Sequence, residues 1–453
     1  MIEILIGALV AVGVGRYIVK GYSPTGVLLT GGLLLLIISV IMGKSVLPAS
    51  VTSTGYRLID IVEYVKNLLM SRGGDLGMMI MVLCGFASYM THIGANDVVV
   101  KLASRPLKMI NSPYLLMVAA YIVACLMSLA VSSATGLGVL LMATLFPVMV
   151  NMGISRGAAA AICASPASII LAPTSGDVIL AAQASEMPLI DFAFKTTLPI
   201  SIAAILGMCI AHFFWQRYLD RKEHIETEML DVNEIKTHAP NFYAILPFTP
   251  IIGVLVFDGK WLPELHIVAI IILCMMLSAV IEFIRSFSAK EVFAGLEVAY
   301  RGMADAFAQV VMLLVAAGVF AQGLTTVGFI HALIDGAQSL GSGAIVMMIA
   351  LVLITMLAAM TTGSGNAPFY AFVELIPRLA SNVGVNPAYL TIPMLQASNL
   401  GRTLSPVSGV VVAVSGMAKI SPFEVMKRVS VPVLVGLVIV IVATEILVPS
   451  TLG

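Results

Sequence analysis

Charged residues are scarce in this sequence. They make up 11% of its 453 residues, against about 25% in a typical soluble domain, while 60% of the residues are hydrophobic. So few charges cannot cover the water-facing surface of a globular protein of this length, and the sequence therefore predicts an integral membrane protein. The formal net charge is zero, which argues against the strongly basic surface of a nucleic-acid partner.

The short motifs of several enzyme classes are also missing. The sequence contains no H-E-x-x-H, no P-loop and no paired intramembrane aspartates, so it predicts no enzyme, no cofactor and no bound metal. The five cysteines lie in apolar runs without a C-x-x-C pair, and cysteines of that kind usually serve as small packing residues.

What the sequence has instead is a series of long apolar runs. Many approach or exceed the roughly 20 residues that span a bilayer as a helix, and the strongest covers 24–43. The runs are continuous rather than alternating, which favours helices over a β-barrel. Glu3 stands where a secretory signal would carry basic residues, so the first run is expected to be a permanent span.

Two stretches about 230 residues apart resemble each other. SSATGLG (132–138), ASPASIILAPTSGD (164–177) and DFAFKTTLP (191–199) recur in order as TTGSGNAP (361–368), ASNLGRTLSPVSG (397–409) and FEVMKRVSVP (423–432). The repeat predicts two halves, 1–217 and 241–453, joined by a cytoplasmic linker at 218–240.

Each half is expected to contain five full spans and one re-entrant hairpin, so the predicted fold is an all-α membrane protein with about ten spans, two hairpins and helices broken at the midplane. The hairpins cover 113–151 and 342–381. The spans of the first half are expected at 2–19, 24–43, 74–94, 154–187 and 191–216, and those of the second at 241–257, 264–284, 302–324, 386–417 and 424–448. Segments 57–72 and 95–111 mix apolar and basic positions, which fits either surface-lying amphipathic helices or exposed loops.

Five crossings per half make the second half an inverted copy of the first, as in many transporters. Under this topology, sixteen basic residues fall on one side of the membrane and seven on the other. The positive-inside rule makes the richer side cytoplasmic. Both termini are then periplasmic, the first hairpin opens to the cytoplasm and the second to the periplasm of a bacterial inner membrane.

Polar and glycine-containing segments cluster at four matched places: the two hairpin tips and the breaks at 172–177 and 404–409. Each break frees backbone groups that lipid cannot satisfy and starts a helix whose positive end favours carboxylates. Small residues also serve as packing contacts between spans, and that alternative stays open for any single position. The predicted substrate-binding residues are Ser133, Thr135, Gly136, Thr174, Ser175, Thr362, Gly363, Ser364, Asn366, Asn399, Arg402, Ser405 and Ser408.

Charged residues inside apolar spans are costly and therefore point to function. Arg402 is expected to clamp a substrate carboxylate with parallel hydrogen bonds. Asp177 is expected to bind a coupling cation or proton, or to pair with Arg402. Glu374 and His92 are further proton-carrying candidates, with an interfacial position as the alternative for both.

These motifs resemble the DcuC family of anaerobic four-carbon-dicarboxylate transporters, and the likeness runs along nearly the whole chain. The resemblance implies succinate export and fumarate–succinate exchange. It also implies membership of the ion-transporter superfamily, whose members have inverted repeats with paired hairpins and usually work as homodimers by an elevator mechanism. Their ligand sites map here onto 132–136, 174–177, 361–366 and 399–408. The sodium-binding Ser-Asn-Thr motifs of some relatives are missing, which favours proton coupling or pure exchange.

Two other functions remain open at this point. A carrier of the same fold could take another small organic anion or an inorganic oxyanion. A channel is the weaker alternative, because long polar pore stripes are missing and matched broken helices suit alternating access better.

Overall fold

The structure, a computed structural model, describes residues 2–20, 22–48, 51–104, 110, 112–131, 133–223, 239–257, 262–263, 265–329 and 343–451. Ser132 of the first tip and most of the predicted linker, 224–238, lie outside these residues. The described chain is helical apart from turns and one isolated β-bridge between Val385 and Thr451. The prediction of an all-helical protein is therefore confirmed.

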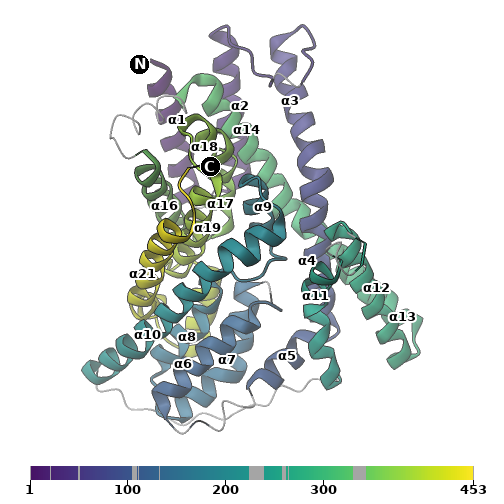
Figure 1. The fold of residues 1–453 in the computed structure, drawn as a ribbon, viewed down its shortest axis with the longest axis vertical. Helices are drawn as coiled ribbons and strands as arrows, with labels where there is room; N and C mark the ends of the chain where they lie inside the picture. Colours follow the sequence, from purple (N-terminus) through teal and green to yellow (C-terminus); the bar gives the residue numbers. More distant parts are fainter. Residues whose placement is uncertain are drawn as a thin grey trace.

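The described helices run along the chain from α1 near the N-terminus to α21 near the C-terminus (Figure 1). The first half consists of α1 (Ile2–Val19), α2 (Pro24–Ile41), α3 (Arg57–Ser71), the π-helical turn η1 (Arg72–Leu76), α4 (Gly77–His92), α5 (Ala95–Ser104), α6 (Pro113–Met127), α7 (Ala134–Asn151), α8 (Arg156–Ala164), η3 (Pro166–Ser168), α9 (Gly176–Ala184), η4 (Asp191–Thr197) and α10 (Leu198–Glu223). The second half consists of η5 (Asn241–Phe248), α11 (Thr249–Val256), α12 (Ile267–Ser286), α13 (Ala289–Ala306), η6 (Phe307–Val311), α14 (Met312–Val327), α16 (Gly343–Thr362), α17 (Asn366–Val373), α18 (Ile376–Val383), α19 (Pro387–Thr403), α20 (Gly409–Ala418) and α21 (Pro422–Leu447).

Within the described residues, seven helices are long and apolar enough to cross a membrane, or eight if the bent pair α3–α4 is one span. The predicted count of ten stays a prediction, because broken helices such as α8–α9 and α19–α20 cannot be assigned by length. The helix from α13 through η6 to α14 has 39 residues. At 1.5 Å per residue it is about 58 Å long, nearly twice the hydrocarbon thickness of a bilayer.

Two predicted boundaries need correction. The segment 57–72 is not a loop, because α3 continues through η1 into α4 with a bend of 43°, and an amphipathic helix along the membrane surface stays a prediction there. The predicted linker 218–240 begins too early, since α10 extends to Glu223.

Helices of the two halves pack against each other in matched pairs. The α2 helix packs on α14, while its counterpart α12 packs on α4; α7 packs on α20, and α17 packs on α9. The α2–α14 contact is so close that a Cβ atom at Gly32 would lie 2.6 Å from the backbone nitrogen of Phe320. Gly32 therefore allows the two helices to approach. In Figure 1, α6, α7, α8 and α10 gather at one end, and α4 and α11–α13 form a separate arm.

The tip between α16 and α17 lies against the break between α19 and α20. Gly363 at this tip has a φ of +72°, a conformation that side chains disfavour. A Cβ atom there would lie 2.9 Å from the backbone nitrogen of Ser408 and the carbonyl carbon of Val407. Only glycine fits this contact between two backbones.

We expect Gly363→Ala to destabilise the fold more than Gly153→Ala. Gly153 also has a positive φ, +88°, but nothing lies within 4 Å of the position that a Cβ atom would take there. Both variants carry a backbone strain of about 1–2 kcal/mol, and overpacking adds about 1–3 kcal/mol at Gly363. Thermal unfolding of the purified variants measures the difference, and equal melting temperatures would contradict the close contact.

Candidate functional site

One cavity is lined by both hairpin tips and both helix breaks. Its volume is about 390 Å³, within the range of about 300–1,000 Å³ typical of small-molecule sites. The tip segments contribute Ser133–Thr135 and Gly363–Asn366, and the breaks contribute Thr174–Asp177 and Ser408–Val410. Segments that are far apart in the sequence thus enclose one space between the two halves.

Four helices begin at this cavity. The residues before the first turns of α7, α9, α17 and α20 are Ser133, Ser175, Gly365 and Ser408, and all four line the cavity. A helix start carries roughly half a positive charge and unpaired N–H groups. The cavity therefore has the backbone chemistry of an anion site without relying on side-chain charge alone.

The serine hydroxyls at these helix starts differ in whether they already form a hydrogen bond within the protein. Ser133 Oγ accepts a hydrogen bond from the Gly136 nitrogen at 3.1 Å, and Ser175 Oγ accepts one from the Val178 nitrogen at 3.4 Å. The Ser408 hydroxyl is buried and makes no hydrogen bond within the described protein. This hydroxyl is therefore available to a ligand.

The backbone between α8 and α9, which leads into the first break, is held by side chains of α19 in the second half and of α10 in the first. The Gln396 side chain accepts from the Ile170 nitrogen at 2.9 Å and donates to the Ile170 oxygen at 3.3 Å. Ser201 Oγ also donates to this oxygen at 3.2 Å. Buried backbone groups need such partners, because each unsatisfied group costs several kcal/mol in lipid.

Arg402 binds another backbone carbonyl group of the same segment between α8 and α9. Its Nη2 atom donates to the Ala167 oxygen at 2.8 Å. Its Nε atom is buried and makes no hydrogen bond among the described residues, and Nη1 lies near Gly365 of the second tip. The guanidinium group thus lines the cavity with donors to spare, so it can anchor the break and still bind a carboxylate.

Asp177 is buried near Arg402, but its hydrogen-bond partner is a tyrosine. Its carboxylate accepts a hydrogen bond from the Tyr370 hydroxyl at 2.5 Å, and the Asn399 side chain also faces it. Among the described side chains, Asp177 and Arg402 form no direct ion pair. Tyr370 was not predicted from the sequence, although a hydroxyl one helical turn after Asn366 in an apolar hairpin arm is a detectable signal.

The structure brings ten of the predicted residues to the cavity. They are Ser133, Thr135, Thr174, Ser175, Asp177, Gly363, Ser364, Asn366, Arg402 and Ser408. Four other predicted residues are not among those that line the cavity. They are Gly136, Thr362, Asn399 and Ser405, of which Thr362 bonds the Ala358 oxygen within its own helix and Ser405 accepts from the Val407 nitrogen.

The remaining two proton-carrying candidates lie elsewhere. Glu374 forms an ion pair with Arg72 of η1 and lines a separate recess of about 100 Å³. His92 ends α4 and packs near Gly295 of α13. Neither residue lines the central cavity, so a role for either in ion coupling remains a prediction.

Comparisons with known proteins agree with this architecture. The family model for the C4-dicarboxylate anaerobic carrier DcuC matches residues 2–449. The chain is 80% identical to the anaerobic C4-dicarboxylate transporter DcuC of Escherichia coli O6:H1 over 99% of this chain and 98% of that protein. The same identity and coverage hold for the protein of that name from Escherichia coli K12.

A solved structure with a similar fold is the Alcanivorax borkumensis YdaH transporter. It covers 93% of this chain and 98% of its own at 18% identity, with a TM-score of 0.62. At this identity the likeness concerns the fold alone.

The family match confirms the resemblance drawn from the motifs, and with it the prediction of a transporter rather than an enzyme. The chain belongs to the DcuC family of C4-dicarboxylate anaerobic carriers.

Proposed function

We propose that this protein carries four-carbon dicarboxylates across the bacterial inner membrane, exporting succinate and exchanging it for fumarate at the cavity between its two halves. The observation that carries the proposal is the meeting of four helix starts and the Arg402 guanidinium at one cavity. Two carboxylates on a short carbon chain need positive partners at two places. Arg402 serves one carboxylate, and the helix starts with the free Ser408 hydroxyl serve the other.

The packing of the two halves supports an inverted-repeat topology. Several contacts between halves have a counterpart with the halves exchanged, as in α2 on α14 and α12 on α4. Such exchange is what a two-fold relation produces. We infer that the second half is inverted in the membrane, with both termini in the periplasm, because the basic residues then gather on the cytoplasmic side.

The position of the tips supports re-entrant hairpins. Both tips line the same cavity as the two breaks, whereas a crossing helix would place its end at the membrane surface. With 20 residues, α16 is long enough to cross, so the location of its end is the stronger argument. We infer that the hairpins move with the broken helices and carry the substrate by an elevator motion.

Asp177 is the best candidate for proton coupling. A buried carboxylate beside a doubly negative substrate is costly unless it is neutralised. Tyr370 holds Asp177 at the cavity wall rather than in an ion pair with Arg402, so its charge is not already cancelled by direct contact. A proton bound there during net succinate export removes the cost, while exchange of one dicarboxylate for another requires no proton movement.

Counterflow in proteoliposomes tests the function. With succinate inside and labelled fumarate outside, we expect rapid accumulation of label that does not depend on sodium. Net succinate efflux without external substrate should respond to the pH gradient. Absence of exchange, or a strict requirement for sodium, would contradict the proposal.

Substitution of Arg402 tests the site. Arg402→Ala should abolish succinate transport, and Arg402→Lys should raise the KM for succinate by about tenfold or more, because a lysine loses the fork that serves both Ala167 and a carboxylate. Arg301→Lys is the control, since the Arg301 side chain is 80% exposed. Near-normal transport by a folded, inserted Arg402→Ala protein would refute the clamp.

A further inference from the structure

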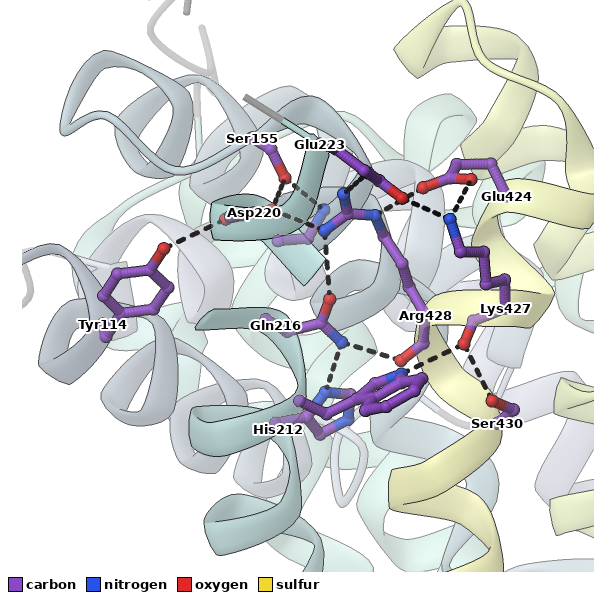
Figure 2. Close-up of polar contacts among 12 residues, drawn as sticks. Tyr114, Ser155, His212, Gln216, Asp220, Glu223, Glu424, Lys427, Arg428 and Ser430 are labelled. Carbon is purple, nitrogen blue, oxygen red and sulfur yellow. Dashed lines mark hydrogen bonds and ion pairs between the residues drawn. The ribbon is translucent and has the colours of Figure 1, made fainter. Parts of the chain in front are cut away.

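A buried polar network joins α10 and α21 at one end of the molecule (Figure 2). Arg428 of α21 lies at its centre with no exposed side-chain surface. Its guanidinium group contacts three carboxylates at 2.6 Å each, those of Asp220, Glu223 and Glu424. A fully buried arginine needs such partners, because an unpaired buried charge is strongly destabilising.

The same network touches both ends of α8. At the first turn, Ser155 Oγ donates to Asp220 Oδ1 at 2.5 Å. Gly157 lies so close to Arg428 that a Cβ atom there would be 2.4 Å from the guanidinium Nε. At the last turn, Ser165 Oγ lies 3.2 Å from His212 Nε2. The helix that leads into the first break is therefore held at its start and at its end.

Arg428 fixes the orientation of the Gln216 side chain. Its backbone oxygen can only accept, and it takes a hydrogen bond from Gln216 Nε2 at 2.7 Å. Its Nη1 group can only donate, and it gives a hydrogen bond to Gln216 Oε1 at 3.3 Å. Arg428 thus determines which end of the Gln216 amide is the nitrogen and which is the oxygen.

The oriented amide in turn fixes the proton on His212. Gln216 Nε2 lies 3.3 Å from His212 Nδ1 and is a donor, so Nδ1 must accept and carries no proton. The Ser165 hydroxyl donates to the Ala161 oxygen at 2.8 Å. Ser165 Oγ must therefore accept from His212, which places the proton on Nε2. The hydrogen bonds allow one form of the ring, a neutral imidazole with Nε2–H.

The chain of contacts ends at the transport site. Ser165 caps the end of α8, and Pro166 starts the short helix η3. Ala167, two residues after Ser165, gives its oxygen to Arg402. The position of this oxygen decides where the Arg402 guanidinium rests.

We propose that Arg428, Gln216 and His212 are positioning residues for transport: Arg428 orients Gln216, Gln216 fixes His212 as the Nε2–H form, and His212 holds Ser165 so that the break presents Ala167 to Arg402. The effect on transport rests on the proposed role of Arg402. The form of His212 does not, so the two can fail separately.

Nitrogen NMR of the full-length protein labelled at histidine tests the first step. The six histidines are separated by comparison with His212→Gln, whose spectrum lacks one ring. We expect the missing ring to show a protonated Nε2 and an unprotonated Nδ1. In Gln216→Leu the contact with Ser165 still favours a proton on Nε2, but Nδ1 loses its hydrogen-bond donor, so we expect the Nδ1 resonance to shift. A cationic ring or an Nδ1–H form in the unmodified protein, or an unshifted Nδ1 resonance in Gln216→Leu, would overturn the proposal.

Succinate uptake by the same variants tests the second step. Gln216→Leu should raise the KM for succinate by about 2- to 30-fold with a smaller change in maximal rate, because the site is displaced rather than lost. Tyr114→Phe is the matched control: it removes a 3.3 Å hydrogen bond to Asp220 in the same network but outside the path to Ser165. Unchanged KM in Gln216→Leu, or an equal rise in Tyr114→Phe, would contradict a positioning role.

The two proposals can fail separately. If Arg402→Lys transports normally while His212 keeps the expected form, the role of Arg402 in binding the substrate is refuted and the hydrogen-bond network of His212 is not.

Discussion

A chain that leaves its helix inside a membrane must find partners for every freed backbone group within the protein. The first break meets this constraint through side chains from two other helices. Gln396 and Ser201 satisfy Ile170, and Arg402 satisfies Ala167. The break can therefore exist only while both halves are assembled. The same requirement brings an arginine to the middle of an apolar bundle, so the pairing of the freed backbone and the proposed anion site depend on one residue.

The two halves contribute the same kinds of backbone segment to the cavity but different charged side chains. Each half supplies one hairpin tip and one break, and each supplies two helix starts. Asp177 comes from the first half and Arg402 from the second, and neither has a like-charged counterpart across the repeat. Matched backbone segments with unequal charges suit the proposed carrier of a small anion, because the charged groups can bind one substrate while both halves contribute to its site.

Much of the architecture could be predicted from residue patterns. Apolar runs located the helices, and glycine with hydroxyl residues located the tips and breaks, since these residues interrupt helices for local reasons. Arg402 stood out because a guanidinium in an apolar run is rare. The π-helical turn at Arg72–Leu76 was missed, because Gly73 and Gly74 suggest an end where the helix continues. Contacts between helices that are distant in the sequence could not be predicted from residue patterns either. The repeat aligns Lys195 with Arg428, yet the Lys195 side chain is 75% exposed and pairs with Asp191. Arg428, in contrast, is fully buried and pairs with carboxylates of both α10 and α21.

Bound succinate is expected in one arrangement, which a cryo-electron microscopy map of the protein with succinate would show directly. One carboxylate should lie within hydrogen-bond distance, about 2.7–3.2 Å, of the Arg402 guanidinium, and the other should lie at the helix starts near Ser408. Succinate bound elsewhere, or continuous helices through residues 165–175 and 404–408, would contradict the account.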